Sequence, residues 1–124
     1  MVDHQIIDVR DTPLSAEDLA ALHANLREQR LFRQEQLQQL SSAAPTRADA
    51  FLDRRAAAQV EVRVKLAASA RMVLADVEAA LARMDLGCYG KCHLCRKPIA
   101  RERLMIVPQA RYCTRCQQVR ETGR

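Results

Sequence analysis

Two long stretches of the chain contain neither glycine nor proline and carry apolar residues at helical spacing. The first begins at Ser15–Asp18, a capping-box-like pattern in which a serine hydroxyl accepts from a free backbone N–H and acidic residues suit the helix N-terminus. Its apolar stripe is narrow, which is typical of a helix that packs against a single partner. The stripe over residues 16–40 consists of Leu19, Leu22, Leu26, Leu37 and Leu40.

The second stretch begins at Thr46, which can cap a helix with Asp49 as its capping-box partner, and Gly87 stops it after Met84 or Asp85. Its apolar residues follow a repeat close to three and four: Val60, Val64, Ala67, Leu74, Val77, Leu81 and Met84. The linker between the two stretches is short and turn-like, so the two helices should lie antiparallel. At about 1.5 Å per residue, the arms would be roughly 37 Å and 55 Å long.

Four cysteines follow in two pairs, Cys92 with Cys95 and Cys113 with Cys116. Each CxxC turn lets two thiolates converge on one cation, and two such turns at this spacing supply four sulfurs for one tetrahedral zinc ion. Because four sulfur ligands leave no open position, we expect one structural zinc ion without chemistry of its own. The segment is too short for a hydrophobic core, so zinc should contribute folding free energy outright. The alternative, two disulfides, requires an oxidising compartment.

The sequence therefore predicts a mainly α protein, in which a long antiparallel coiled-coil hairpin precedes a small four-cysteine zinc-finger module. We expect an N-terminal segment at residues 1–14 that packs near the base, the hairpin at 15–86 with its tip at about 41–55, and the module at 87–124 with a short C-terminal helix. Between the cysteine pairs, Pro98-Ile99 and Arg103–Pro108 predict a short β-hairpin. Its apolar packing would consist of Ile99, Leu104, Ile106 and Tyr112.

Composition and charge narrow the range of functions. Aromatic residues make up only 3% of the 124 residues, which favours an elongated body over a thick core. Residues 1–90 carry 11 Lys/Arg against 13 Asp/Glu, whereas residues 91–124 carry 9 against 2, so the basic module suits an acidic protein surface or nucleic acid. No apolar run approaches the roughly 18 residues of a membrane span, and the N-terminus lacks a secretory signal. We therefore expect a cytoplasmic protein with reduced thiols and no membrane partner.

The residues around the cysteines closely resemble the zinc module of the DksA/TraR family. The matching positions are Tyr89-Gly90, Cys92, Cys95, Ile99, Arg103-Leu104, Pro108, Ala110, Cys113 and Cys116-Gln117. The resemblance implies a bacterial transcription factor that binds RNA polymerase directly, without sequence-specific DNA binding. It further implies that the coiled coil enters the secondary channel, and that its tip modulates initiation near the catalytic centre, often with the nucleotide ppGpp at the polymerase interface. We expect such a protein to be a monomer.

The resemblance also assigns polymerase-facing residues to the tip, where the family carries Asp-x-x-Asp-x-Ala. In this chain Asp49 and Asp53 are four residues apart, Arg54 matches the basic residue after the second acid, and Arg55 replaces the small residue. The net charge of this tip is positive, which argues against a tip that recruits metal for transcript cleavage. As an alternative, both acids can serve as helix caps. A second departure is Arg96, where the family usually has glycine, so we expect a strained or altered turn there.

Two other classes of function compete with this interpretation. The first is a nucleic-acid-binding zinc module with the hairpin as a dimerisation element. Its phosphate contacts would be Lys91, Arg96, Lys97, Arg101, Arg103, Arg111 and Arg115. The second is an enzyme, but the sequence has no Ser/His/Asp grouping, no phosphate-binding glycine loop and no open metal site. We therefore expect no catalytic residues.

Overall fold

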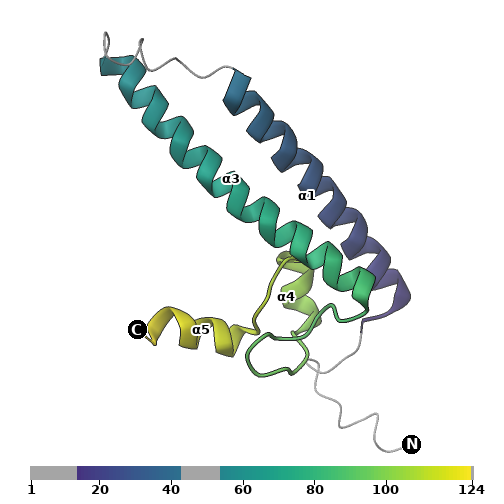
Figure 1. Cartoon of the computed structure of the whole chain (residues 1–124). Helices are drawn as coiled ribbons and strands as arrows, with labels where there is room; N and C mark the ends of the chain where they lie inside the picture. The colour runs from purple at the N-terminus through teal and green to yellow at the C-terminus, as the bar shows by residue number, and fades with distance from the viewer. Residues whose placement is uncertain (1–13, 43–53, 124) are drawn as a thin grey trace, which may run out of the picture.

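The structure is a computed structural model that describes residues 14–42 and 54–123. Over these ranges the chain forms α1 (Ala16–Ser42), α3 (Arg54–Leu86), α4 (Arg101–Ile106) and α5 (Thr114–Thr122). Helices α1 and α3 lie side by side and antiparallel, and the rest of the described chain folds at one end of this hairpin (Figure 1). The predicted fold class, a mainly α hairpin followed by a four-cysteine module, is confirmed.

At the base of the hairpin, the start of α1 and the end of α3 both have the predicted capping residues. The Asp18 amide donates to Ser15 Oγ at 3.0 Å, and the Ser15 amide donates to Asp18 Oδ2 at 3.1 Å, so the capping box at the start of α1 is complete. At the end of α3, Gly87 has a φ of 76° and its amide donates to the Met84 carbonyl, while the Cys88 amide donates to Arg83. This Schellman motif needs a positive φ, which glycine supplies at little cost.

The core lies at the base of the hairpin, which we define as residues 14–26 and 70–86. One buried cluster joins the two helices through Leu26, Val77, Ala80 and Leu81. A second joins α1 to the zinc module through Leu22, Cys92, Ile99, Leu104 and Ala110. In the distal part, residues 27–42 and 54–69, no side chain that the structure describes is buried. Val64, predicted to lie in the apolar stripe, is 61% exposed there, because its neighbours Arg63 and Ala67 are turned further inward.

The predicted β-hairpin between the cysteine pairs is wrong. Arg101–Ile106 forms the helix α4 instead, and the one extended contact described in this region is an isolated bridge between Lys91 and Pro98. The helical spacing buries Leu104 against α1 but leaves Ile106 81% exposed. Ile99 is buried as expected, and the small core of the module is built from Ile99, Leu104, Ala110 and Cys92.

Several predicted features lie outside the described residues. These are the N-terminal segment before Leu14, the Thr46 cap and the tip acids Asp49 and Asp53. Leu14 itself is half-buried and packs against the cluster that joins α1 to the zinc module. The proposed domain boundaries therefore stay a prediction.

Candidate metal centre

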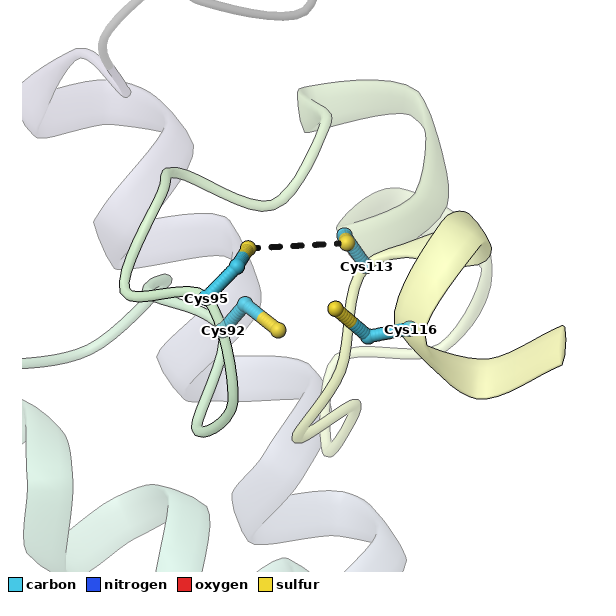
Figure 2. Close-up of side chains that lie close together, drawn as sticks. All are labelled: Cys92, Cys95, Cys113 and Cys116. Carbon is cyan, nitrogen blue, oxygen red and sulfur yellow. Dashed lines mark hydrogen bonds between the residues drawn. The ribbon is translucent and has the colours of Figure 1, made fainter. Parts of the chain in front are cut away.

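The four predicted cysteines come together in one cluster. Their Sγ atoms all lie within 4.8 Å of one another, and the Sγ atoms of Cys95 and Cys113 are 3.9 Å apart. Figure 2 shows the four side chains directed toward a common centre between the two turns. Tetrahedral zinc with Zn–S bonds of about 2.3 Å separates its sulfurs by about 3.8 Å. The geometry and the all-sulfur donor set therefore fit one structural Zn²⁺, held by Cys92, Cys95, Cys113 and Cys116.

The first cysteine turn closes through its own backbone. The Arg96 amide donates to the Cys92 carbonyl at 3.0 Å, and the Cys92 amide donates to Lys97 at 2.9 Å. To make this turn Arg96 adopts a φ of 64°, so the strained turn expected from the missing glycine is confirmed. A non-glycine residue in this left-handed region costs on the order of 1 kcal/mol.

The second cysteine turn leads directly into a helix. Cys113 is the N-cap of α5, and Cys116 lies in its first turn. The Gln117 amide donates to the Cys113 carbonyl at 2.9 Å, which closes this turn. A helix N-terminus favours negative charge, so this arrangement helps to hold thiolates next to a cation.

The electrostatics of the cluster suit a divalent cation. Burial opposes ionisation of Cys92, but hydrogen bonds from the amides of Cys95, Cys113 and Leu94 outweigh it and lower the pKa of that thiol to about 6. The hydrogen bond with Cys113, followed by burial and the remaining sulfurs, raises the pKa of Cys116 to about 12. One thiolate forms readily, whereas full ionisation of the cluster requires a positive charge at its centre.

Two ion pairs connect the module to the hairpin. Arg101 of α4 forms a bidentate pair with Asp18 of α1 through one edge of its guanidinium, Nε donating to Oδ2 at 2.9 Å and Nη2 to Oδ1 at 2.8 Å. This pairing, followed by the Ser15 amide, holds the pKa of Asp18 well below its usual range. Arg111 donates to Asp76 Oδ1 of α3 from Nη2 at 2.9 Å and from Nε at 3.2 Å. The module is therefore attached to both helices.

Gly90 and Tyr89 also lie at this junction. Gly90 has a φ of 91°, and a Cβ at this position would lie 3.6 Å from Leu14 Cδ1 and 3.7 Å from Leu104 Cδ1. The adjacent Tyr89 donates its hydroxyl to the Pro108 carbonyl at 2.7 Å, and burial raises the pKa of this phenol to about 12. The Tyr-Gly dipeptide therefore connects α3 to the zinc module through one hydrogen bond and a positive-φ turn beside Leu14 and Leu104.

Three of the seven cations predicted to contact phosphate have structural roles instead. Arg101 and Arg111 form the ion pairs to the hairpin, and Arg103 Nε donates to the Tyr112 carbonyl at 2.9 Å. Sequence reasoning missed the partners Asp18 and Asp76 because they lie 83 and 35 residues away along the chain. Of the three residues predicted to face the polymerase, Asp49, Asp53 and Arg54, only Arg54 is described, as the exposed first residue of α3. None of the described helices is both long enough and apolar enough to cross a bilayer.

Comparison with known proteins agrees with this geometry. Residues 87–121 match the family described as prokaryotic dksA/traR C4-type zinc finger. An uncharacterized protein of Aquifex aeolicus (strain VF5) is 36% identical over 52 residues, which cover 40% of this chain and 36% of that protein. The structure of transcription factor DksA2 from Pseudomonas aeruginosa matches with a TM-score of 0.67 and 21% identity, over 89% of this chain and 88% of that one. The predicted resemblance is confirmed: residues 87–121 form a zinc finger of the DksA/TraR family, on a chain with the DksA fold.

Proposed function

We propose that this chain is a DksA-like bacterial transcription regulator, which binds RNA polymerase through the secondary channel and modulates initiation with its hairpin tip. The main support is the shape of the described chain. The zinc module is attached at the base, where Asp76 is the most distal residue in the ion pairs described above. From Asp76 to Arg54, helix α3 continues for about 33 Å at 1.5 Å per residue (Figure 1). A two-helix rod of this length can reach into a narrow channel.

The distribution of buried residues supports the same role. The buried clusters lie at the base, whereas the distal part presents polar and charged side chains together with exposed apolar ones such as Phe32 and Val62. A rod that enters another protein needs a surface that its partner can contact, and it does not need a core of its own. We propose that Asp49, Asp53 and Arg54 face the polymerase from the tip, with Arg54 exposed at the start of α3.

In this proposal the zinc ion has a structural role and the protein has no enzymatic activity of its own. The zinc module holds α1 and α3 together at the base and fixes the direction of the rod. The protein would act as a monomer in the cytoplasm, and ppGpp at the polymerase interface would be an effector. The P. aeruginosa protein of the same fold is a transcription factor, which supports a role in transcription for this chain.

The test is binding to purified core RNA polymerase, in competition with another protein that occupies the secondary channel. We expect a saturable complex that the competitor displaces, and no comparable affinity for bare duplex DNA. The Asp53→Asn variant should retain binding but change the lifetime of open promoter complexes, with and without ppGpp. Binding that the competitor leaves unaffected would place the contact elsewhere on the polymerase. Tight, steeply salt-dependent binding to bare duplex would instead indicate a nucleic-acid-binding module.

A further inference from the structure

The first zinc knuckle, residues 91–97, carries three cations that the fold does not use. Lys91, Arg96 and Lys97 are all exposed. None of these side chains has a hydrogen-bond or ion-pair partner among residues 14–42 and 54–123. This contrasts with Arg101, Arg103 and Arg111 of the same module, each of which is bonded to the hairpin or to the module itself. The knuckle contains no acidic residue, so its three charges are not balanced locally.

An exposed apolar side chain lies among these cations. Leu94 lies between the zinc ligands Cys92 and Cys95 in the first turn, and its side chain is 54% exposed. The only aromatic side chain in the knuckle, His93, is occupied by an edge contact with Tyr112 at 5.9 Å between ring centroids. The exposed surface therefore combines one apolar residue with a rim of positive charge.

The backbone of Arg96 is a second, independent feature of this surface. Its φ of 64° would cost a glycine little, and glycine would make the same two hydrogen bonds of the turn. The arginine side chain contributes no bond to the described structure that offsets this cost. Residues kept in strained backbone regions without a structural gain gather at functional sites. Arg96 fits that pattern, because the turn places its guanidinium on the outside of the knuckle.

We propose that the first zinc knuckle is a second docking surface, on which Leu94 enters an apolar pocket of an acidic protein surface and Lys91, Arg96 and Lys97 contact the surrounding carboxylates. This inference rests on the proposed function and names the partner as the rim of the polymerase channel. The knuckle lies at the base, at the opposite end of the hairpin from the C-terminus of α1 and the N-terminus of α3 (Figure 1). With that far end inside the channel, the knuckle therefore stays outside it.

The chemistry of the knuckle favours protein over nucleic acid. Three cations are fewer than the roughly 6–10 phosphate contacts of a protein with strong electrostatic affinity for DNA. The knuckle offers no free aromatic ring on which a base could stack. An apolar centre within a polar and charged rim is the usual arrangement of a protein–protein interface.

The experiment measures the affinity of zinc-loaded, full-length variants for core RNA polymerase at low and high salt. The double variant Lys91→Glu/Lys97→Glu should bind about tenfold more weakly at low salt and lose most of its salt dependence. Leu94→Ala should weaken binding at both salt concentrations. Arg96→Gly should weaken binding about threefold at low salt while the knuckle becomes more stable, which separates docking from folding. Arg115→Glu, on the second cysteine turn, is the control matched in charge to the single variant Lys97→Glu, and it should bind as the wild type does while Lys97→Glu binds more weakly.

The outcomes separate this inference from the proposed function. If the wild type binds polymerase and the knuckle variants bind equally well with their zinc retained, the docking surface is wrong and the proposed function stands. If Arg115→Glu weakens binding as much as the single variant Lys97→Glu, the effect is one of overall charge and the specific surface is wrong. If the knuckle variants lose affinity for bare duplex only, the partner is nucleic acid. If the wild type does not bind polymerase, both proposals fail.

Discussion

The base and the distal part of the hairpin are built from the same two helices but differ in how deeply their side chains are buried. At the base, Leu22, Leu26 and Val77 are almost completely buried, and the zinc module adds its own small core to theirs. In the distal part, apolar side chains such as Phe32, Val62 and Leu66 are exposed, and no described side chain is buried. The transition falls near Ala70, the most distal buried residue of α3.

This difference indicates where the stability of the molecule resides. The distal parts of the two helices contact each other only through partly buried side chains such as Leu40 and Val60, so the distal part should open at low free energy. The base combines buried apolar contacts, a metal site and two ion pairs, and it should unfold last. Separating these roles leaves the distal surface free of packing constraints, as a segment that contacts a partner requires.

Loss of the metal site should have the largest effect on the base. Cys92→Ser or Cys113→Ser should release zinc and unfold the module, because the segment lacks a core that is sufficient without metal. The exposed Cys88→Ser variant is the matched control and should keep its zinc. Metal analysis and circular dichroism measure both effects. An unchanged zinc content in Cys92→Ser would show that the cluster does not hold the ion as described.

Leucine-to-alanine substitutions should lower the free energy of unfolding by different amounts in the base and in the distal part. Leu26→Ala removes a fully buried side chain and should lower the free energy of unfolding by about 2–5 kcal/mol. Leu66→Ala makes the same chemical change in the distal part, where the side chain is 45% exposed, and should cost less than about 1 kcal/mol. Urea denaturation of the zinc-loaded protein gives both values. Equal losses would mean that the distal part shares the core of the base.

The features that could be predicted from the sequence are those with local signals. The capping box of Ser15 and Asp18, the stop at Gly87 and the spacing of the cysteines are each recorded within a few residues. The extent of packing along the hairpin could not be predicted, because an apolar stripe does not reveal how closely two helices approach. The predicted stripe therefore included the exposed Val64 as readily as the buried Val77.

The errors in the zinc module have a related cause. The apolar run Leu104–Val107 is too short to distinguish a strand from a helix by its period. A distant contact accompanies the helical outcome, since Arg101 at the start of α4 is bonded to Asp18 on α1, 83 residues away. The spacing of neighbouring residues does not predict such a distant partner. Because their partners are distant in the sequence, sequence reasoning assigns Arg101 and Arg111 to phosphate contacts instead of ion pairs. The roles of the tip acids Asp49 and Asp53 stay predictions.

The ion pair between Asp18 and Arg101 should make the base sensitive to acid. The pKa of the Asp18 carboxyl is held well below its usual value, first by Arg101 and then by the Ser15 amide. A lowered folded-state pKa stabilises the fold above the unfolded value of about 3.9, and this contribution is lost as the pH falls below it. Asp18→Asn should therefore reduce the melting temperature at pH 7 and flatten its decline below pH 4.

The matched control for this ion pair is Glu17→Gln, which alters the neighbouring exposed acid at the start of the same helix. Thermal melts from pH 3 to pH 7 compare the wild type, Asp18→Asn and Glu17→Gln. The melts at neutral pH give the comparison in which the zinc ligands are not protonated. If Asp18→Asn and Glu17→Gln behave alike at neutral pH, the effect belongs to the helix terminus. The ion pair to α4 would then add no measurable stability to the junction.

The smallest expected effect concerns the strained turn of the first zinc knuckle. Arg96→Gly should relieve a left-handed backbone cost of about 1 kcal/mol, partly offset by the greater freedom of glycine in the unfolded chain. The net gain in unfolding free energy should be about 0.5 kcal/mol. Arg96→Ala removes the same charge but keeps a Cβ at the strained position, so it should bring no such gain. Zinc affinity from chelator competition and the free energy of unfolding at neutral pH should both be higher for Arg96→Gly than for Arg96→Ala and the wild type. Equal stability of the two variants would show that this turn contains no strain.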